Sequence, residues 1–406
     1  MRDLNVGINF GGEDIPVGRL VEKGSELWFQ YDAEFLGRRL EISPFALRLR
    51  TGLYNVEARD LWGVFHDSLP DTFGRKALYR ELAKRGLPTD SVLDMLAVQG
   101  SRAMGALTYC PNYDDPDPPP ALELAILAQD AMALYGDSSA KVLEALVRAA
   151  GTAGGARPKV VVGRTPDGRL WPDGGVVPQE ATRWLIKFTG EDPAYSGALE
   201  AAYMTLAKAA GIDVPEHEVL EAEGGERYFA VKRFDRDGVI RHHMHTFGGM
   251  AVRGSDNLVD YADLLGVTHL VTRDVEAVHE CFRRMVFNVL VGNGDDHDRN
   301  FAFLMDAKGV WRVSPAYDMT WTPRKPMHTL LVAGKDRDIT RADCAAVAEA
   351  VAIRKRDAEP LIEQVWAGVR SWLSVADQYA LPGHVIDQVH ATIMARAQLL
   401  LAGHRA

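Results

Sequence analysis

A short stretch, residues 293–300, concentrates side chains that bind divalent cations and accept protons. It reads Asn-Gly-Asp-Asp-His-Asp-Arg-Asn, and one further carboxylate, Asp318, follows Asn300 by eighteen positions. Carboxylate and amide oxygens are the ligands that Mg²⁺ prefers, and Mg²⁺ commonly completes its shell with water and the phosphates of a substrate. These residues therefore predict an oxygen-lined Mg²⁺ site in which Asp295, Asn300 and Asp318 take part.

The elements around this stretch should bring its oxygen ligands together. Residues 301–304 and 310–313 have the composition of two short strands joined by a tight turn. Paired strands lie about 5 Å apart, so residues that flank a hairpin become neighbours. We therefore expect Asn300 and Asp318 to converge, with Asp295 nearby. The alternative is an Asx-rich turn that only caps the hairpin.

A site that binds phosphates also needs positive charge, and Lys187 is the first candidate. It lies in an otherwise apolar strand, 184–188, where burial of an unpaired ammonium group would cost several kcal/mol. We therefore expect an acidic partner, and Glu200, in a helix over 196–211, is the nearest suitable one. An edge lysine that reaches solvent is the alternative for Lys187, and a solvated carboxylate is the alternative for Glu200.

A glycine-rich segment, 151–159, is the third element suited to phosphate. Glycines such as Gly154 and Gly155, together with the small Ala156, let backbone N–H groups approach phosphate oxygens, and Lys159 could add a charge. A flexible linker explains the same composition. Neither the P-loop nor the dinucleotide-binding glycine pattern occurs in the chain.

The order of these parts is that of a protein kinase: a glycine loop, a strand lysine, a helix glutamate, a loop with Asp and Asn, a hairpin and a final Asp. A helical apolar pattern over 275–290, which Gly292 should end, precedes the loop. Strands dominate the earlier half and helices the later half. This pattern predicts an α+β fold.

The motifs resemble those of the HipA-like serine/threonine kinases, which are the toxins of bacterial toxin–antitoxin pairs. The matching segments, which together reach across essentially the whole chain, are 6–109, 152–159, 186–188, 233–236, 292–300 and 316–318. The resemblance implies a protein-kinase-like two-lobed fold. Residues 1–112 would form a β-rich N-terminal subdomain, 121–235 a region like a kinase N-lobe, and 236–406 a mostly helical C-terminal lobe.

The same resemblance implies a role for each site residue. Asp295 would orient or deprotonate the substrate hydroxyl, and Asn300 and Asp318 would hold Mg²⁺. Thr152 would be the residue whose autophosphorylation silences the enzyme. The residues implied to bind ATP are Lys187, Lys159, Gly154, Gly155, Ala156, Val231, Arg233, Phe234, His297 and Asn300.

Partners also follow from the resemblance. Members of this family phosphorylate proteins of translation such as aminoacyl-tRNA synthetases, and so arrest growth. A small helix-turn-helix antitoxin that binds operator DNA typically neutralises them. We therefore expect a protein substrate and an antitoxin partner, with DNA contacted only through that antitoxin.

Three positions depart from the pattern that the resemblance leads us to expect. Gly294 stands where a threonine is expected, Arg299 replaces a frequent lysine, and Lys232 occupies a place that is commonly acidic. Adenine is usually held by backbone groups, so Lys232 should be tolerated, while Arg299 keeps the charge but not the point geometry of lysine.

The composition agrees with a soluble enzyme. The 406 residues have a formal net charge of −10, which disfavours direct binding to nucleic acid. Three widely spaced cysteines indicate neither a disulfide framework nor a zinc site. The first residues lack the apolar stretch of a signal peptide. We expect a cytoplasmic protein without a membrane contact.

Two other functions remain open from the residues alone. His242, His243 and His245, with the aspartates around His297, could belong to a metal-dependent hydrolase. A small-molecule kinase would use the same phosphate chemistry as a protein kinase.

Overall fold

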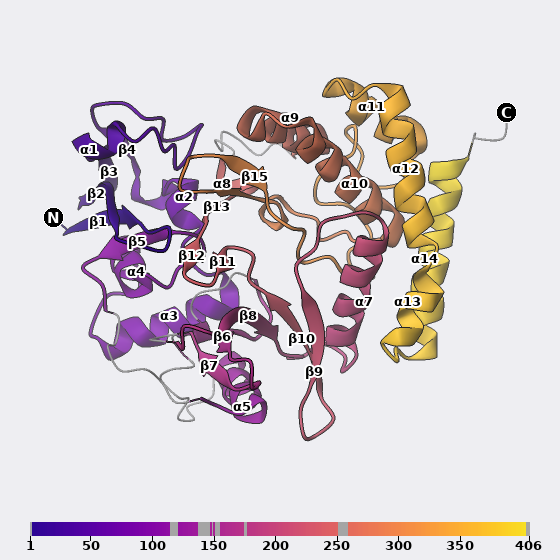
Figure 1. Ribbon diagram of the computed structural model, residues 1–406, viewed down its shortest axis with the longest axis horizontal. Coiled ribbons are helices and arrows are strands. Elements are labelled where there is room, and N and C mark those ends of the chain that lie inside the picture. Colours follow the sequence, from indigo (N-terminus) through magenta and orange to yellow (C-terminus); the bar gives the residue numbers. More distant parts are fainter. Residues whose placement is uncertain are drawn as a thin grey trace. The chain divides into compact units, whose positions relative to one another are not determined.

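The computed structural model describes residues 2–113, 121–136, 147, 149–150, 155–173, 177–250 and 259–402 (Figure 1). The chain divides into two compact units. The first comprises Met1–Ala194, Leu220–Val252 and Leu304–Val310, and the second comprises Tyr195–Val219, Arg253–Phe303 and Trp311–Ala406.

The first unit begins with an antiparallel sheet in the order β4-β3-β2-β1-β5. Alternate residues of its strands, such as Leu20, Leu27 and Phe29, are fully buried, as the period of two in a strand requires. The strands are β1 (Arg2–Ile8), β2 (Ile15–Lys23), β3 (Glu26–Tyr31), β4 (Tyr54–Glu57) and β5 (Leu107–Cys110).

Helices cover parts of this unit. Helix α4 packs against β1 and β5, and α3 contacts both α4 and α5. Phe73, Ala77, Leu78 and Leu82 recur at a helical period in the sequence, and the helix that they predict over 71–85 is confirmed as α3. The helices are α1 (Ala33–Leu36), α2 (Gly63–His66), α3 (Thr72–Lys84), α4 (Val92–Gln99), α5 (Leu124–Tyr135) and α8 (Phe247–Met250), with a 3₁₀ turn η1 (Ala58–Asp60).

A second antiparallel sheet carries the lysines of interest, in the order β7-β6-β8-β10-β9. Phe73 and Ala77 of α3, Leu127 of α5, and Val160 and Ile186 of the sheet share one buried cluster. The strands are β6 (Lys159–Arg164), β7 (Leu170–Pro172), β8 (Thr182–Lys187), β9 (His217–Glu221) and β10 (Arg227–Lys232), followed by the short β11 (Arg236–Asp237), β12 (Ile240–Arg241) and β13 (His243–Thr246).

The second unit is built around α10, which packs against α9, α12 and α14. Its fully buried residues include Phe282, Met285 and Leu290. Its elements are α7 (Ser196–Ala209), α9 (Tyr261–Thr272), α10 (Val275–Val291), the 3₁₀ turn η2 (Asp298–Asn300), β15 (Trp311–Val313), α11 (Arg341–Ala350), α12 (Lys355–Val369), α13 (Trp372–Gln378) and α14 (Gly383–Leu401), and β14 (Ala302–Met305) begins here.

The predicted elements around the candidate site are confirmed. Helix α10 ends at Gly292, and β14 and β15 form the expected hairpin, in which the Ser314 N–H donates to the Ala302 carbonyl. The α+β fold class is confirmed as well. The five prolines over 111–120 predict a linker, and the pattern over 140–150 predicts a helix, but most of both segments lies outside the described residues. Among the described residues, no helix has the length and apolar character to cross a membrane.

Candidate active site

The loop that carries Asp295 starts from a left-handed turn at the end of α10. Gly292 has φ +71°, and its N–H donates to the Asn288 carbonyl. A Cβ atom at this position would lie 2.8 Å from Cγ2 of Thr392. Glycine is therefore required both by the backbone conformation and by the close approach of α14.

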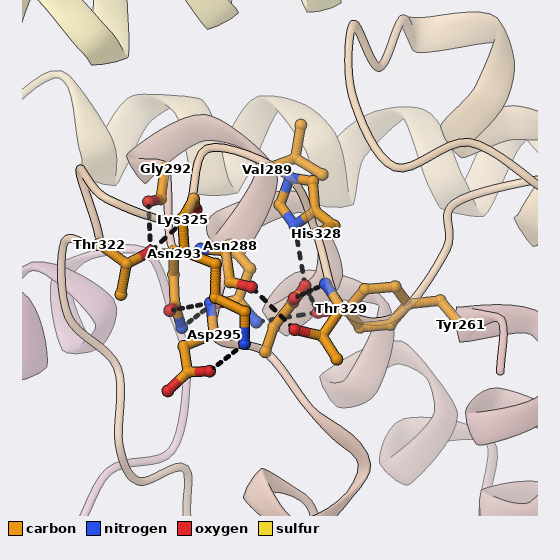
Figure 2. A network of polar contacts seen from close by, with 12 residues as sticks. Tyr261, Asn288, Val289, Gly292, Asn293, Asp295, Thr322, Lys325, His328 and Thr329 are labelled. Carbon is orange, nitrogen blue, oxygen red and sulfur yellow. Dashed lines mark hydrogen bonds and ion pairs between the residues drawn. The ribbon is translucent and has the colours of Figure 1, made fainter. Parts of the chain in front are cut away.

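A chain of side-chain hydrogen bonds fixes the loop backbone (Figure 2). The Asp295 N–H donates to Oδ1 of Asn293 at 3.3 Å, and Nδ2 of Asn293 donates to Oδ1 of Asn288 at 3.1 Å. Nδ2 of Asn288 donates in turn to the Tyr261 hydroxyl at 2.9 Å. Helices α9 and α10 therefore jointly set the position of the Asp295 backbone.

The chain of bonds ends on Asp296, which is fully buried. Its carboxylate accepts from the Tyr261 hydroxyl at 2.7 Å, from Nδ1 of His328 at 2.8 Å and from the Thr329 N–H at 2.8 Å. Burial, followed by the charge of Asp296, raises the pKa of the Tyr261 phenol well above its ordinary value. Tyr261 therefore stays protonated and remains a donor to Asp296.

Asp295 has the opposite environment. Its side chain is 49% exposed, and its carboxylate forms an ion pair with the Lys325 ammonium at 2.5 Å (Figure 2). The two adjacent aspartates thus have different roles. Asp296 anchors the loop inside the unit, while Asp295 presents its carboxylate at the surface.

Asn300 is oriented toward the same loop. Its Nδ2 donates to the Asp295 carbonyl at 2.8 Å. The bond engages the amide nitrogen, so the amide oxygen is the atom that Asn300 can offer to a cation. Ring nitrogen Nδ1 of His297 accepts from the Arg299 N–H at 3.2 Å and caps η2.

The hairpin places Asp318 next to this arrangement. The hydroxyl of Tyr317 donates to the Arg299 carbonyl at 2.6 Å, so the residue before Asp318 is bonded to the residue before Asn300. Asp318 itself has φ +54°. A left-handed conformation costs a residue with a side chain roughly 1 kcal/mol or more, and such strain concentrates at functional sites.

In the first unit, Lys159 and Lys187 are cross-strand partners in β6 and β8. Both side chains are buried, and Lys187 Nζ lies 5.6 Å from the centre of the Phe229 ring. The structure therefore places the two lysines that the resemblance assigns to ATP side by side in one sheet.

The absence of a side chain at Gly155 leaves space for the ammonium group of Lys159. A Cβ atom on Gly155, which has φ +98°, would lie 2.3 Å from Lys159 Nζ. The Gly155 N–H donates to Oδ2 of Asp71 at 3.0 Å, and Ala156 follows in the same bend. Thr152 and Gly154 lie outside the described residues.

The resemblance implies that residues 231–234 form the hinge beside adenine, and they lie at the end of β10 and in the turn after it. Val231 pairs with Leu185, and the Arg233 N–H donates to the Arg183 carbonyl at 2.8 Å. The Arg233 guanidinium forms a bidentate ion pair with the fully buried Asp235. Although burial opposes ionisation, Arg233 and Arg236 hold the pKa of Asp235 well below its ordinary value.

The side chain of Arg233 is thus part of a buried structural ion pair, while Phe234 is half-buried in the turn that follows. The expected pairing of Lys187 with Glu200 stays a prediction, because β8 and α7 belong to different units.

The histidine cluster has structural partners. Nε2 of His243 donates to the Ile42 carbonyl at 2.8 Å. His245 lies between Oδ2 of Asp67, at 2.7 Å from its Nδ1, and the hydroxyl of Ser43, at 3.1 Å from its Nε2. The order is that of a Ser–His–Asp triad, but Ser43 is fully buried, so no substrate reaches it.

Within the described part of the chain, no three or more His, Cys, Asp or Glu side chains are grouped to hold a metal ion. The hydrolase alternative therefore gains no support. The proposed Mg²⁺ ligands Asn300 and Asp318 include only one carboxylate, so the absence of a group of three such side chains from the described residues does not test them.

Sequence reasoning missed the residues that support the site. Tyr261, His328 and Lys325 are distant in sequence and have no motif of their own. Asn288 did give a signal, because an amide between Phe287 and Val289 in an apolar helix needs a buried polar partner.

The fold and this loop place the chain in a known class, that of the kinase-like α+β proteins. The HipA of Shewanella oneidensis, solved in a complex of a toxin–antitoxin system with HipB and its operator DNA, has a TM-score of 0.73 with 17% identity, over 98% of this chain and 97% of that one. At this identity the likeness shows the fold.

Family models match both the N-terminal and the C-terminal part of the chain. Residues 12–110 match the HipA N-terminal domain, and residues 151–373 match the HipA-like C-terminal domain. The second match spans more than half of the chain. This chain belongs to the HipA-like family.

Curated relatives match over shorter stretches. A Sinorhizobium fredii protein named "Putative kinase Y4dM" is 31% identical over 37% of this chain and 40% of its own length. A Haemophilus influenzae protein named "Putative kinase" is 28% identical over 33% of this chain and 44% of its own length. The matched stretch is thus less than half of either relative.

Proposed function

We propose that this protein is an ATP- and Mg²⁺-dependent serine/threonine protein kinase. The observation that carries the proposal is the arrangement of Asp295 and Asn300, in which the asparagine amide nitrogen is bonded to the aspartate carbonyl at 2.8 Å. That bond joins the Asn300 side chain to the backbone of Asp295, so one short loop carries both the carboxylate and the amide oxygen that phosphoryl transfer uses.

Each residue has a defined task in this proposal. Asp295 orients the acceptor hydroxyl and takes its proton. Lys159 and Lys187, which lie opposite each other on β6 and β8, bind the phosphates of ATP, as the family resemblance implies. The backbone over Val231–Phe234 receives the adenine, so the structural ion pair of Arg233 does not conflict with that task.

The oxygen ligands present fit Mg²⁺. Asn300 and Asp318 offer an amide oxygen and a carboxylate, the hard donors that this ion takes alongside phosphate and water. When bound, Mg²⁺ would neutralise phosphate charge. The chain's own contribution is to hold these two side chains on adjoining segments through the bond between Tyr317 and the Arg299 carbonyl.

Family membership supports a wider proposal. The HipA of Shewanella oneidensis was solved with HipB and operator DNA, and we propose that this chain likewise acts as a growth-arresting toxin with an antitoxin partner. Its target would be a protein of translation such as an aminoacyl-tRNA synthetase, and Thr152 would be the site of autophosphorylation.

Substitution of Asp295 by asparagine tests the proposal. Purified wild-type protein with γ-labelled ATP and Mg²⁺ should label itself, with the label mapped to Thr152, and Asp295→Asn should lose at least about 100-fold in rate because the proton acceptor is gone. Asp377→Asn, an exposed aspartate of α13, is the matched control.

The same variants can be expressed in cells. Growth should stop with the wild type and with Asp377→Asn, and continue with Asp295→Asn. Equal labelling by wild type and Asp295→Asn would refute the assignment of Asp295. An unlabelled wild-type protein would refute autophosphorylation at Thr152, and a wild-type protein that neither releases ADP nor binds Mg·ATP would refute the kinase.

A further inference from the structure

The segment over residues 322–329 lies along the loop of Asp295 and contacts it repeatedly (Figure 2). The Thr322 hydroxyl accepts from the Gly294 N–H at 2.7 Å, and the Thr329 hydroxyl donates to the Gly294 carbonyl at 2.9 Å. His328 contacts the buried Asp296 at 2.8 Å. The 322–329 segment is thus held to the loop at both of its ends.

Gly294 makes this approach possible. A Cβ atom there would lie 1.9 Å from the Lys325 carbonyl oxygen and 2.5 Å from the Met327 carbonyl oxygen. Any side chain at position 294 would push the 322–329 segment away. The glycine at this position, where the family resemblance led us to expect threonine, therefore has a steric reason.

The close approach delivers a positive charge to the proposed catalytic base. The Lys325 ammonium lies 2.5 Å from Oδ1 of Asp295, and the two side chains are 48% and 49% exposed. An ion pair this exposed adds little to folding stability. Its position, rather than its strength, is what suggests a function.

The geometry that in-line phosphoryl transfer requires brings the phosphoryl group close to Asp295, the residue that Lys325 contacts. In the step proposed above, the acceptor oxygen bonds to the γ-phosphorus while the bond to the β,γ-bridging oxygen breaks. The hydroxyl proton passes to Asp295, and ADP leaves with the bonding pair. The base lies about 3 Å from the hydroxyl and the hydroxyl about 3 Å from phosphorus, so a cation touching the base is within reach of the phosphoryl oxygens.

From these contacts we infer that Lys325 is a further catalytic residue, which contacts the transferred phosphoryl group, and that Gly294 is the positioning residue that admits it. The inference rests on the proposed kinase function. Charge on the phosphoryl oxygens is what such a cation stabilises, and its proton is retained throughout the step.

The first experiment compares Lys325→Met and Lys325→Arg with Lys355→Met, an exposed lysine at the start of α12. ADP release from Mg·ATP should fall about 30- to 100-fold in kcat for Lys325→Met, with KM for ATP within threefold. Lys325→Arg should recover at least a third of the wild-type rate, and Lys355→Met should match the wild type.

The second experiment measures binding by calorimetry. Lys325→Met should bind Mg·ADP within twofold of the wild type but bind Mg·ADP with aluminium fluoride at least tenfold more weakly, because only the mimic of the transferred group meets the lysine. An unfolding midpoint close to that of the wild type excludes misfolding as the cause.

The third experiment tests Gly294. Gly294→Thr should lower kcat by about as much as Lys325→Met, and the double variant should lose no more than Lys325→Met alone. If Lys325→Met kept the wild-type kcat and bound Mg·ADP with aluminium fluoride as tightly as the wild type, this inference would be overturned. The proposed kinase function would not be affected. A wild-type protein that neither releases ADP nor binds Mg·ATP would overturn the proposed function itself.

Discussion

Asp295 and Asp296 are adjacent and carry the same side chain, but their environments are opposite. Asp296 is fully buried and accepts three hydrogen bonds, whereas Asp295 is half-exposed. Hydrogen bonds to a buried carboxylate offset the large cost of removing its charge from water. The fold therefore depends on Asp296, and the proposed chemistry depends on Asp295.

This contrast predicts two different effects of the same substitution. Asp296→Ala should lower the free energy of unfolding by about 3–5 kcal/mol, because it leaves the donors of Tyr261 and His328 buried without their acceptor. Asp295→Ala should change the free energy of unfolding by less than about 1 kcal/mol. Urea denaturation followed by circular dichroism measures both, and equal effects would contradict the division.

At the scale of elements, the end of α10 decides where the loop begins. Gly292 combines a left-handed backbone with contact to Thr392 of α14, and the capping residue Asp274 fixes the other end through the Glu276 N–H at 2.9 Å. Both ends of α10 are therefore fixed, and so are the start and the direction of the loop that follows it.

Two glycine-to-alanine substitutions should have opposite signs. Gly292→Ala should destabilise the protein by about 1–2 kcal/mol or more, since alanine is strained at φ +71° and its Cβ atom meets Thr392. Gly266→Ala, inside α9 with open space around it, should stabilise by up to about 1 kcal/mol. Thermal unfolding compares the two, and a stabilising Gly292→Ala would refute this account of the turn.

At the scale of the whole molecule, stability should depend on pH through a buried histidine. His243 is fully buried, and that burial lowers its pKa from 6.5 to about 4. His245 and Asp67 are the charged neighbours that also act on it. In the unfolded chain the imidazole is exposed to water and regains its ordinary pKa.

The sign follows from proton counting. Between pH 6.5 and 4 the unfolded state binds more protons than the folded state, so the free energy of unfolding should fall by up to about 3 kcal/mol as the pH falls through this window. Asp67, whose lowered pKa starts from 3.8, acts at lower pH. In urea denaturation at a series of pH values, His243→Gln should reduce the dependence of the free energy of unfolding on pH in this window. The control His384→Gln changes an exposed histidine and should not reduce it. An unchanged pH dependence in His243→Gln would refute the assignment.

The sequence by itself determined the elements and the family. Helix α10, its end at Gly292, the hairpin that follows and the pair of Asp295 and Asn300 could all be predicted, because apolar periodicity, glycine and short-range spacing are local properties of the chain. The departure at Gly294 was visible too, but its reason was not.

Only the tertiary structure decided which of the two aspartates is buried and what holds the loop. Tyr261 stands at the start of α9, two helices before Asp296, and Lys325 and His328 follow Asp296 after a hairpin. Their contacts therefore arise only when separate elements pack. Burial and hydrogen-bond partners are properties of that packing. A run of acidic residues in sequence therefore cannot show which carboxylate is structural and which is presented for chemistry.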